Sequence, residues 1–112
     1  RGAIDNATGV AAVLELGRVF AAGPPPQRSL YFVAFTAEEK GLLGASYFAA
    51  HPPLALETLA AVINIEMFSP HGATADIASW GRGRVSLEDS LSQVAQARGR
   101  RYTPEPDLEA GF

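Results

Sequence analysis

Four acidic residues stand at places in this sequence where they could act together on a reacting group. Glu38 and Glu39 are neighbours directly after an uncharged, largely apolar run, and Glu66 lies near the end of a second apolar run. Asp5 lies in a polar, turn-like stretch that precedes an apolar helical pattern. Neighbouring carboxylates repel each other, and a carboxylate at the edge of an apolar core is unfavourable unless a cation pairs with it.

Metal-dependent hydrolysis is one chemistry that such acids could perform. Carboxylate oxygens bind hard and borderline divalent cations, and two metal ions about 3.5–4 Å apart need a bridging group such as a carboxylate. A hydrolase also needs an acid that takes a proton from the attacking water and returns it to the leaving group. Adjacent residues at a strand end point in different directions, so Glu38 and Glu39 could divide these two roles.

The same acids also have an ordinary structural interpretation. Two glutamates after a strand most often lie in a solvated loop, and an isolated aspartate before a helix is most often a cap or turn residue. Glu66 is harder to explain in this way, because apolar residues surround it in the sequence and a buried acid needs a partner.

The elements that must position these acids alternate along the chain. Periodicity and turn residues predict three helices, over Gly9–Ala22, Ala45–Ala50 and Leu87–Arg98. They also predict one strand between the first two helices, over Ser29–Thr36, and two strands before the last helix, over Ala60–Met67 and Ala73–Trp80. This order favours an α/β layered fold with a largely parallel central sheet flanked by helices. Ligands bind beyond the carboxyl ends of strands in such sheets, so we expect the four acids to converge there.

Smaller features support this assignment of elements. Glu15 and Arg18 are spaced to pair on the outer face of the first helix. Gly41 and Gly44 are expected to let the loop turn and the next helix pack closely. Ser86, with Asp89 three residues later, predicts a capping pair for the last helix.

Composition limits the classes of protein to consider. The 112 residues suffice for one small domain, and 47% of them are apolar. The formal charge of −3 gives no basic footprint for nucleic acid, and the absence of cysteine removes disulfides and thiolate metal sites. Charges interrupt the longest apolar candidate, Val10–Ala22, so we expect no integral membrane segment.

Three stretches of the sequence together resemble a known family. GAIDNATGVAAVLELGR (Gly2–Arg18), FVAFTAEEKGLLGASYF (Phe32–Phe48) and VINIEM (Val62–Met67) are similar, in this order and at these intervals, to the zinc aminopeptidase family. This is family twenty-eight of the metallopeptidases, in the MH clan. The resemblance implies a zinc exopeptidase-like fold, two zinc ions per complete domain, a peptide substrate, and an extracellular or periplasmic location.

The resemblance also implies a role for each acid. Asp5 matches the aspartate that bridges both zinc ions, Glu38 the general base, Glu39 a ligand of one zinc and Glu66 a ligand of the other. The family usually has aspartate at the last of these positions, and glutamate is one methylene longer. The peptide bond that follows the bridging aspartate is typically cis in the family, so we expect a cis bond between Asp5 and Asn6.

Two histidines complete the site in the family, and neither has a counterpart here. One lies upstream of the Asp-Asn stretch and the other far downstream, whereas this chain starts after the first and stops at Gly111-Phe112. His51 and His71 match neither ligand position, and His51 is interpreted as a surface cap at a helix end. We therefore interpret residues 1–112 as the central part of a single catalytic domain, truncated at both ends and inactive alone.

The functional prediction is a metallo-aminopeptidase, and several alternatives stay open. Carboxypeptidases and aminoacyl cyclotransferases share these residues, and a catalytically inactive binding or receptor-type domain shares the fold. An unrelated α/β binding domain whose acids are merely solvated is a further alternative, which convergence of Asp5, Glu39 and Glu66 would exclude. The sequence does not determine side-chain specificity or oligomeric state.

Overall fold

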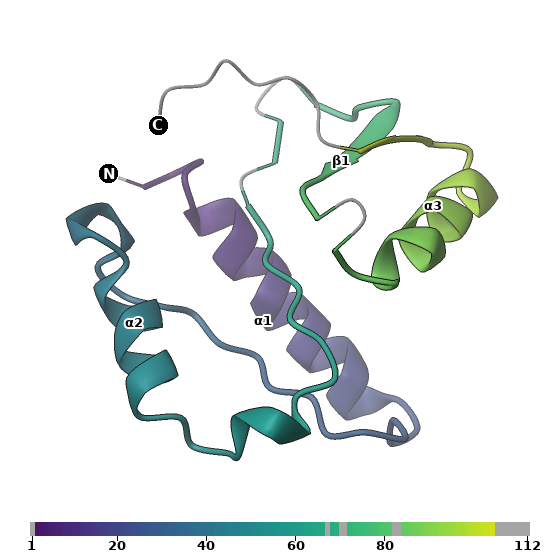
Figure 1. Ribbon diagram of the computed structural model, residues 1–112. Coiled ribbons are helices and arrows are strands. Elements are labelled where there is room, and N and C mark those ends of the chain that lie inside the picture. Colours follow the sequence, from purple (N-terminus) through teal and green to yellow (C-terminus); the bar gives the residue numbers. More distant parts are fainter. Residues whose placement is uncertain (1, 67, 70–71, 82–83, 105–112) are drawn as a thin grey trace. The chain divides into compact units, whose positions relative to one another are not determined.

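The computed structural model describes residues 2–66, 68–69, 72–81 and 84–104, which fall into two compact units. Unit 1 is Arg1–Phe68 and unit 2 is Ser69–Phe112. Unit 1 contains helices α1 (Ala7–Ala22) and α2 (Leu43–Ala50) and the 3-10 turns η1 (Glu38–Lys40) and η2 (Leu56–Thr58) (Figure 1). Unit 2 contains β1 (Asp76–Ser79), α3 (Leu87–Ala97) and β2 (Arg101–Pro104). No helix in the described part of the chain is both long enough and apolar enough to cross a lipid bilayer.

Helix α1 starts at Ala7, directly after its N-cap Asn6 and two residues earlier than the periodicity predicts. The Asn6 side chain accepts a hydrogen bond from the backbone N–H of Gly9 at 2.9 Å, which satisfies one of the free donors of the first turn. The helix ends at Ala22, with Gly23 as its C-cap, and three prolines follow. The predicted pair is confirmed: Glu15 and Arg18 form an exposed ion pair at 2.6 Å, and the Arg18 hydrogen bond lowers the pKa of Glu15.

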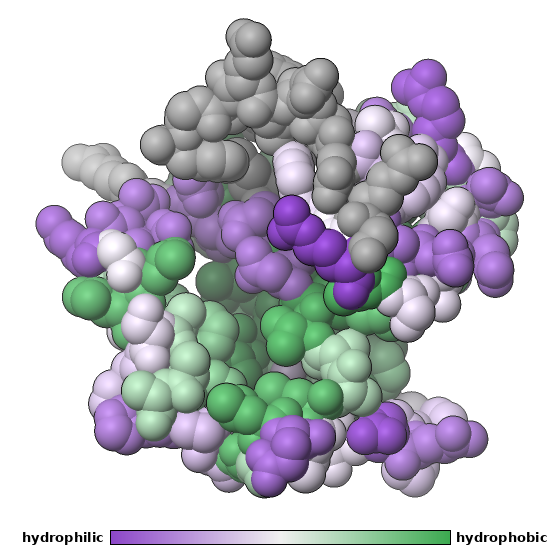
Figure 2. Space-filling model, in the orientation of Figure 1, coloured by the Kyte–Doolittle hydropathy of each residue, from purple (hydrophilic) through white to green (hydrophobic). Residues whose placement is uncertain are grey.

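The two predicted central strands of unit 1 are not formed as strands. Residues 29–36 and 60–66 are extended, but in the described part of unit 1 neither belongs to a hydrogen-bonded sheet. Their apolar side chains are exposed instead of covered on both faces, with Val62 and Ile63 at 77% and 75%. The prediction was wrong because an apolar run indicates a tendency to be buried, whereas a strand also needs a neighbouring backbone to pair with. Figure 2 shows hydrophobic residues gathered over these elements of unit 1.

A left-handed turn leads from the first extended segment into α2. Ala37, Gly41 and Leu42 all have positive φ, of 55°, 93° and 57°. The backbone N–H of Gly44 bonds to the Thr36 carbonyl at 3.0 Å, and a Cβ on Gly44 would lie 2.6 Å from that oxygen. The expected roles of Gly41 in the turn and Gly44 in close packing are therefore confirmed, and α2 begins two residues earlier than predicted.

Unit 2 is a strand–helix–strand unit with a parallel pair of strands. Strands β1 and β2 pair in parallel, with Ile77 opposite Tyr102 and Ser79 opposite Pro104. Helix α3 matches its prediction to within one residue, but Ser86 makes no side-chain cap bond. Because β2 is four residues long and ends in proline, it carries no alternating pattern that would have predicted it.

The buried side of α3 is narrow. Ala95 is fully buried, whereas the neighbouring Val94 is exposed. Ala95 is the single hydrophobic residue that is buried within the described ranges. Among the residues described, the structure thus has three α-helices and a two-stranded parallel sheet, and the larger central sheet that the sequence predicts is not formed.

Candidate metal centre

The loop that carries Asp5 is closed by one backbone hydrogen bond and one hydrogen bond from a side chain. The peptide bond between Asp5 and Asn6 is cis, as expected. The backbone N–H of Ala7 bonds to the Gly2 carbonyl at 2.9 Å, and the Thr8 hydroxyl donates to the Ile4 carbonyl at 2.8 Å. Asp5 itself is exposed at the start of α1, so its carboxylate is accessible from solvent.

Glu66 lies against this loop, although about sixty residues separate them in the sequence. The Asn6 amide donates to the Ile65 carbonyl at 3.0 Å and to Glu66 Oε2 at 3.3 Å. The Asn64 amide donates to Glu66 Oε1 at 2.6 Å. Each carboxylate oxygen of Glu66 therefore has one amide donor, and the segment that ends at Glu66 is joined to the residue that follows Asp5.

Glu38 and Glu39 form the first two residues of η1, directly after the extended segment 29–36. The backbone carbonyl of Glu38 accepts bonds from Gly41 and Leu42, which closes the turn. Both glutamate side chains are exposed, and in the described part of the chain neither forms a hydrogen bond or an ion pair. They follow the first apolar run as the sequence predicts, while their placement beside Asp5 and Glu66 stays a prediction.

The two histidines fall outside this arrangement. His51 is the C-cap of α2, where its backbone N–H donates to the Tyr47 carbonyl at 2.8 Å. This confirms its interpretation as a cap at a helix end. The centroids of the Tyr47 and His51 rings lie 4.6 Å apart. His71 lies outside the described residues.

The acidic side chains of this site are of a type that zinc accepts as ligands. Glu66 accepts one hydrogen bond at each oxygen, and a carboxylate offers about four lone-pair sites in all, so acceptor capacity for a cation remains. Carboxylate oxygen is an accepted zinc ligand. Within the residues that the structure describes, however, no three His, Asp or Glu side chains lie close enough together to hold a metal ion.

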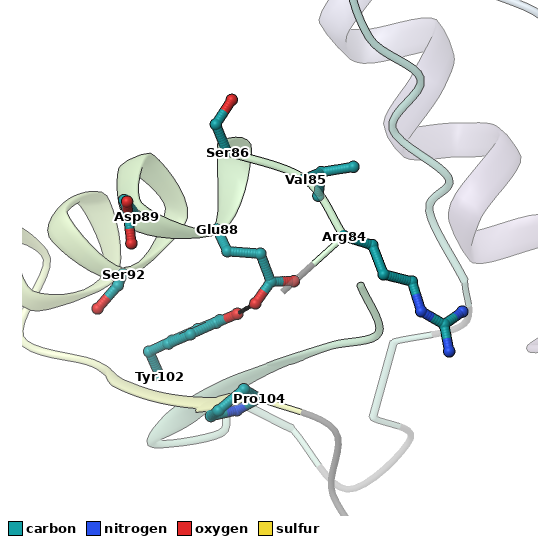
Figure 3. A pocket seen from close by; sticks show the side chains of 8 residues that line it. All are labelled: Arg84, Val85, Ser86, Glu88, Asp89, Ser92, Tyr102 and Pro104. Carbon is teal, nitrogen blue, oxygen red and sulfur yellow. Dashed lines mark hydrogen bonds between the residues drawn. The ribbon is translucent and has the colours of Figure 1, made fainter. Parts of the chain in front are cut away.

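A second polar cluster lies in unit 2, and sequence reasoning missed it. The Ser79 hydroxyl donates to Glu88 Oε1 at 2.9 Å and lies 2.8 Å from the Tyr102 hydroxyl, which donates to Glu88 Oε2. Figure 3 shows the Glu88 and Tyr102 side chains pointing toward one another, while Arg84 extends away from that carboxylate. The cluster borders an open pocket of about 590 Å³. No local pattern in the sequence signals it, because β1, α3 and β2 contribute one residue each.

Comparison with known proteins gives a consistent assignment. The family model described as Peptidase family M28 matches residues 1–112. A probable zinc metalloprotease of Pyrenophora tritici-repentis is 48% identical over 66 residues, which are 59% of this chain and 15% of that protein. A probable zinc metalloprotease of Pyrenophora teres f. teres is also 48% identical over 66 residues, 59% of this chain and 14% of that protein.

A bacterial relative matches over a shorter stretch. Aminopeptidase YwaD of Bacillus subtilis is 44% identical over 50 residues, which are 45% of this chain and 11% of that protein. The chain thus spans at most 15% of the length of these curated relatives. No solved structure matches it significantly. Because the family model covers every residue from 1 to 112, the chain belongs to peptidase family M28.

Proposed function

We propose that this chain is the central part of the catalytic domain of a zinc-dependent exopeptidase that removes N-terminal residues from peptides. The family match supports metallopeptidase chemistry, and the relatives named as zinc metalloproteases and as an aminopeptidase support zinc and the aminopeptidase assignment. The observation that carries the proposal within the structure is the contact between the Asp5–Asn6 loop and Glu66, through the Asn6 amide.

The proposed roles are those that the family resemblance implies, and the kind and exposure of each side chain are compatible with them. Asp5, Glu39 and Glu66 would supply the carboxylate oxygens that hold the zinc, with Asp5 as the ligand that two ions would share. The metal, when bound, supplies Lewis acidity that makes water a stronger nucleophile. Glu38 accepts the proton of the attacking water and delivers it to the leaving amine. Its carboxylate is exposed and makes no hydrogen bond or ion pair within the described residues, so it is available for proton transfer.

Two substitutions in the full-length protein separate these roles. Glu38→Gln removes a base but no ligand, so zinc content should be kept while turnover falls by about 10²–10⁴-fold. Asp5→Ala removes the shared ligand, so zinc itself should be lost. Metal analysis after dialysis, together with hydrolysis of an aminoacyl anilide, measures both effects. Equal zinc loss in the two variants would show that the roles are assigned wrongly.

The choice of substrate class is tested with four substrates. An aminopeptidase should hydrolyse an aminoacyl anilide with a free amine and not the same anilide with an acetylated amine. Hydrolysis of a peptide with a blocked N-terminus and a free carboxylate would instead indicate a carboxypeptidase. Cyclisation of an N-terminal glutaminyl peptide would indicate a cyclotransferase. A protein that binds no zinc and turns over none of these would be a binding domain, which would overturn the proposal.

A further inference from the structure

Three hydrogen bonds of the Asn6 and Thr8 side chains join the start of α1 to residues 65, 66 and 68. Asn6 donates to the Ile65 carbonyl and to Glu66 Oε2, and the Thr8 hydroxyl accepts from the backbone N–H of Phe68 at 3.2 Å. We propose that Asn6 and Thr8 are positioning residues, which hold the Glu66 carboxylate beside the loop that carries Asp5. This inference rests on the proposed function, because it assigns these residues a purpose at the same site.

Asn6 suits this role because it uses both ends of its amide. Its oxygen caps α1 through Gly9 N–H at 2.9 Å, while its nitrogen donates to the backbone and side chain of the other segment. An aspartate could cap the helix equally well but has no donor, and a serine hydroxyl has a single proton, which cannot be donated to both residue 65 and residue 66. Only an amide of this length both starts the helix and ties residues 65 and 66 to it.

Asn64 completes the arrangement from the other side of the carboxylate. Its amide donates to Glu66 Oε1, whereas Asn6 donates to Oε2. Two donors on the two oxygens fix the plane of the carboxylate as well as its position. A metal ligand oriented in this way needs little reordering on binding, which is how hydrogen-bond partners around a ligand raise metal affinity.

Gly9 allows the close approach that these bonds require. It is buried, and a Cβ at this position would lie 2.6 Å from the Ile65 carbonyl oxygen. Residues 65, 66 and 68 therefore lie against the first turn of α1, where the Asn6 and Thr8 side chains contact them. The contact is a feature of tertiary structure, because 59 and 60 residues separate the partners.

The test is the substitution Asn6→Ser, which keeps a capping oxygen and removes the amide that reaches Glu66. We expect the zinc affinity of the full-length protein, measured by calorimetric titration, to fall about 10- to 100-fold. In the metal-free protein, we expect faster hydrogen–deuterium exchange in the peptide that contains residues 64–68. The α-helical circular dichroism should stay unchanged, because the cap is kept.

Two further variants make the result specific. Thr58→Ala deletes a hydroxyl that donates to the Ala55 carbonyl at 2.6 Å in η2, and it should leave zinc affinity unchanged. Asn64→Ala leaves the cap of α1 intact and frees Glu66 Oε1, so it should weaken zinc binding even if Asn6→Ser does not fold.

The possible outcomes separate this inference from the proposed function. Wild-type zinc affinity in both Asn6→Ser and Asn64→Ala would overturn the positioning role while leaving the proposed function standing. If the unaltered protein binds no zinc, the proposed function fails. The rate of hydrogen exchange in the peptide that contains residues 64–68 is then compared between Asn6→Ser and the unaltered protein. An unchanged rate would show that Asn6 does not hold this peptide in place, and the positioning role would fail too.

Discussion

At the scale of single residues, glycines show where unit 1 tolerates a side chain and where it does not. Gly9 and Gly17 both lie within α1, and alanine is normally the better helix former by about 0.5–1 kcal/mol. Their surroundings differ, however. A Cβ at Gly9 would meet the Ile65 carbonyl oxygen at 2.6 Å, whereas a Cβ at Gly17 would make ordinary contact with the Phe32 ring at 3.7 Å.

The two glycine-to-alanine substitutions should therefore have opposite signs. Gly17→Ala should raise the free energy of unfolding by about 0.5–1 kcal/mol, because helix propensity improves without a clash. Gly9→Ala should lower it by about 1–3 kcal/mol, because the helix must move away from residue 65. Urea denaturation of the pair measures both changes. A stabilising Gly9→Ala would mean that α1 does not approach the extended segment this closely.

At the scale of elements, unit 2 is held together by side chains that link a helix to two strands. Glu88 in the first turn of α3 accepts hydrogen bonds from Ser79 on β1 and from Tyr102 on β2. Its charge also favours that end of the helix, where the free N–H groups give a partial positive charge. The loop after α3 closes through the Arg100 N–H to the Ala95 carbonyl at 2.9 Å, with Gly99 at a positive φ of 66°.

Removing the Tyr102 hydroxyl should loosen this strand–helix–strand unit. Tyr102→Phe keeps the ring and deletes a hydrogen bond to a part-buried carboxylate, so we expect a loss of about 1–2 kcal/mol. Tyr31→Phe is the matched control, because Tyr31 is 57% exposed and should change stability by less than about 0.5 kcal/mol. Thermal unfolding followed by circular dichroism compares them. Equal stability of the two variants would show that the Glu88 cluster adds nothing.

At the scale of the whole molecule, the chain leaves much of its apolar surface in contact with solvent. More than twenty large hydrophobic side chains are exposed, among them five in the extended segment at residues 30, 31, 32, 33 and 35. Monomeric proteins rarely expose contiguous apolar patches larger than a few hundred Å². An apolar surface of this kind, shown in part in Figure 2, is available for contact with other polypeptide.

The isolated 112-residue chain should therefore bind a fluorescent apolar dye such as anilinonaphthalene sulfonate. Dye fluorescence should rise on mixing and fall when Val62 and Ile63 are both replaced by serine, since these side chains are 77% and 75% exposed. A double replacement of the exposed polar residues Gln27 and Glu57 by serine is the control. No fluorescence from the unaltered chain would show that this surface is covered in solution.

The sequence by itself determined the family and the helices, and it predicted the kind of chemistry that is proposed above. Helices α1 and α3 follow from apolar periodicity, which is a local cause, so they match prediction to within two residues, and the Asn6 cap accounts for the earlier start of α1. The acidic residues stand out because a carboxylate beside an apolar run is unfavourable unless a cation pairs with it. The three quoted stretches were sufficient to predict the peptidase family that the family model confirms.

Only the tertiary structure decided which of these residues meet. Sequence order does not show that Asn6 reaches Glu66 or that Ser79, Glu88 and Tyr102 cluster, because such contacts join distant segments. The sequence also predicted strands at residues 29–36 and 60–66, which the structure does not form, since a strand needs a neighbouring backbone to pair with and not an apolar run alone. Local hydrogen bonds and periodicity can be read from neighbouring residues, whereas pairing across the chain depends on which segments pack together.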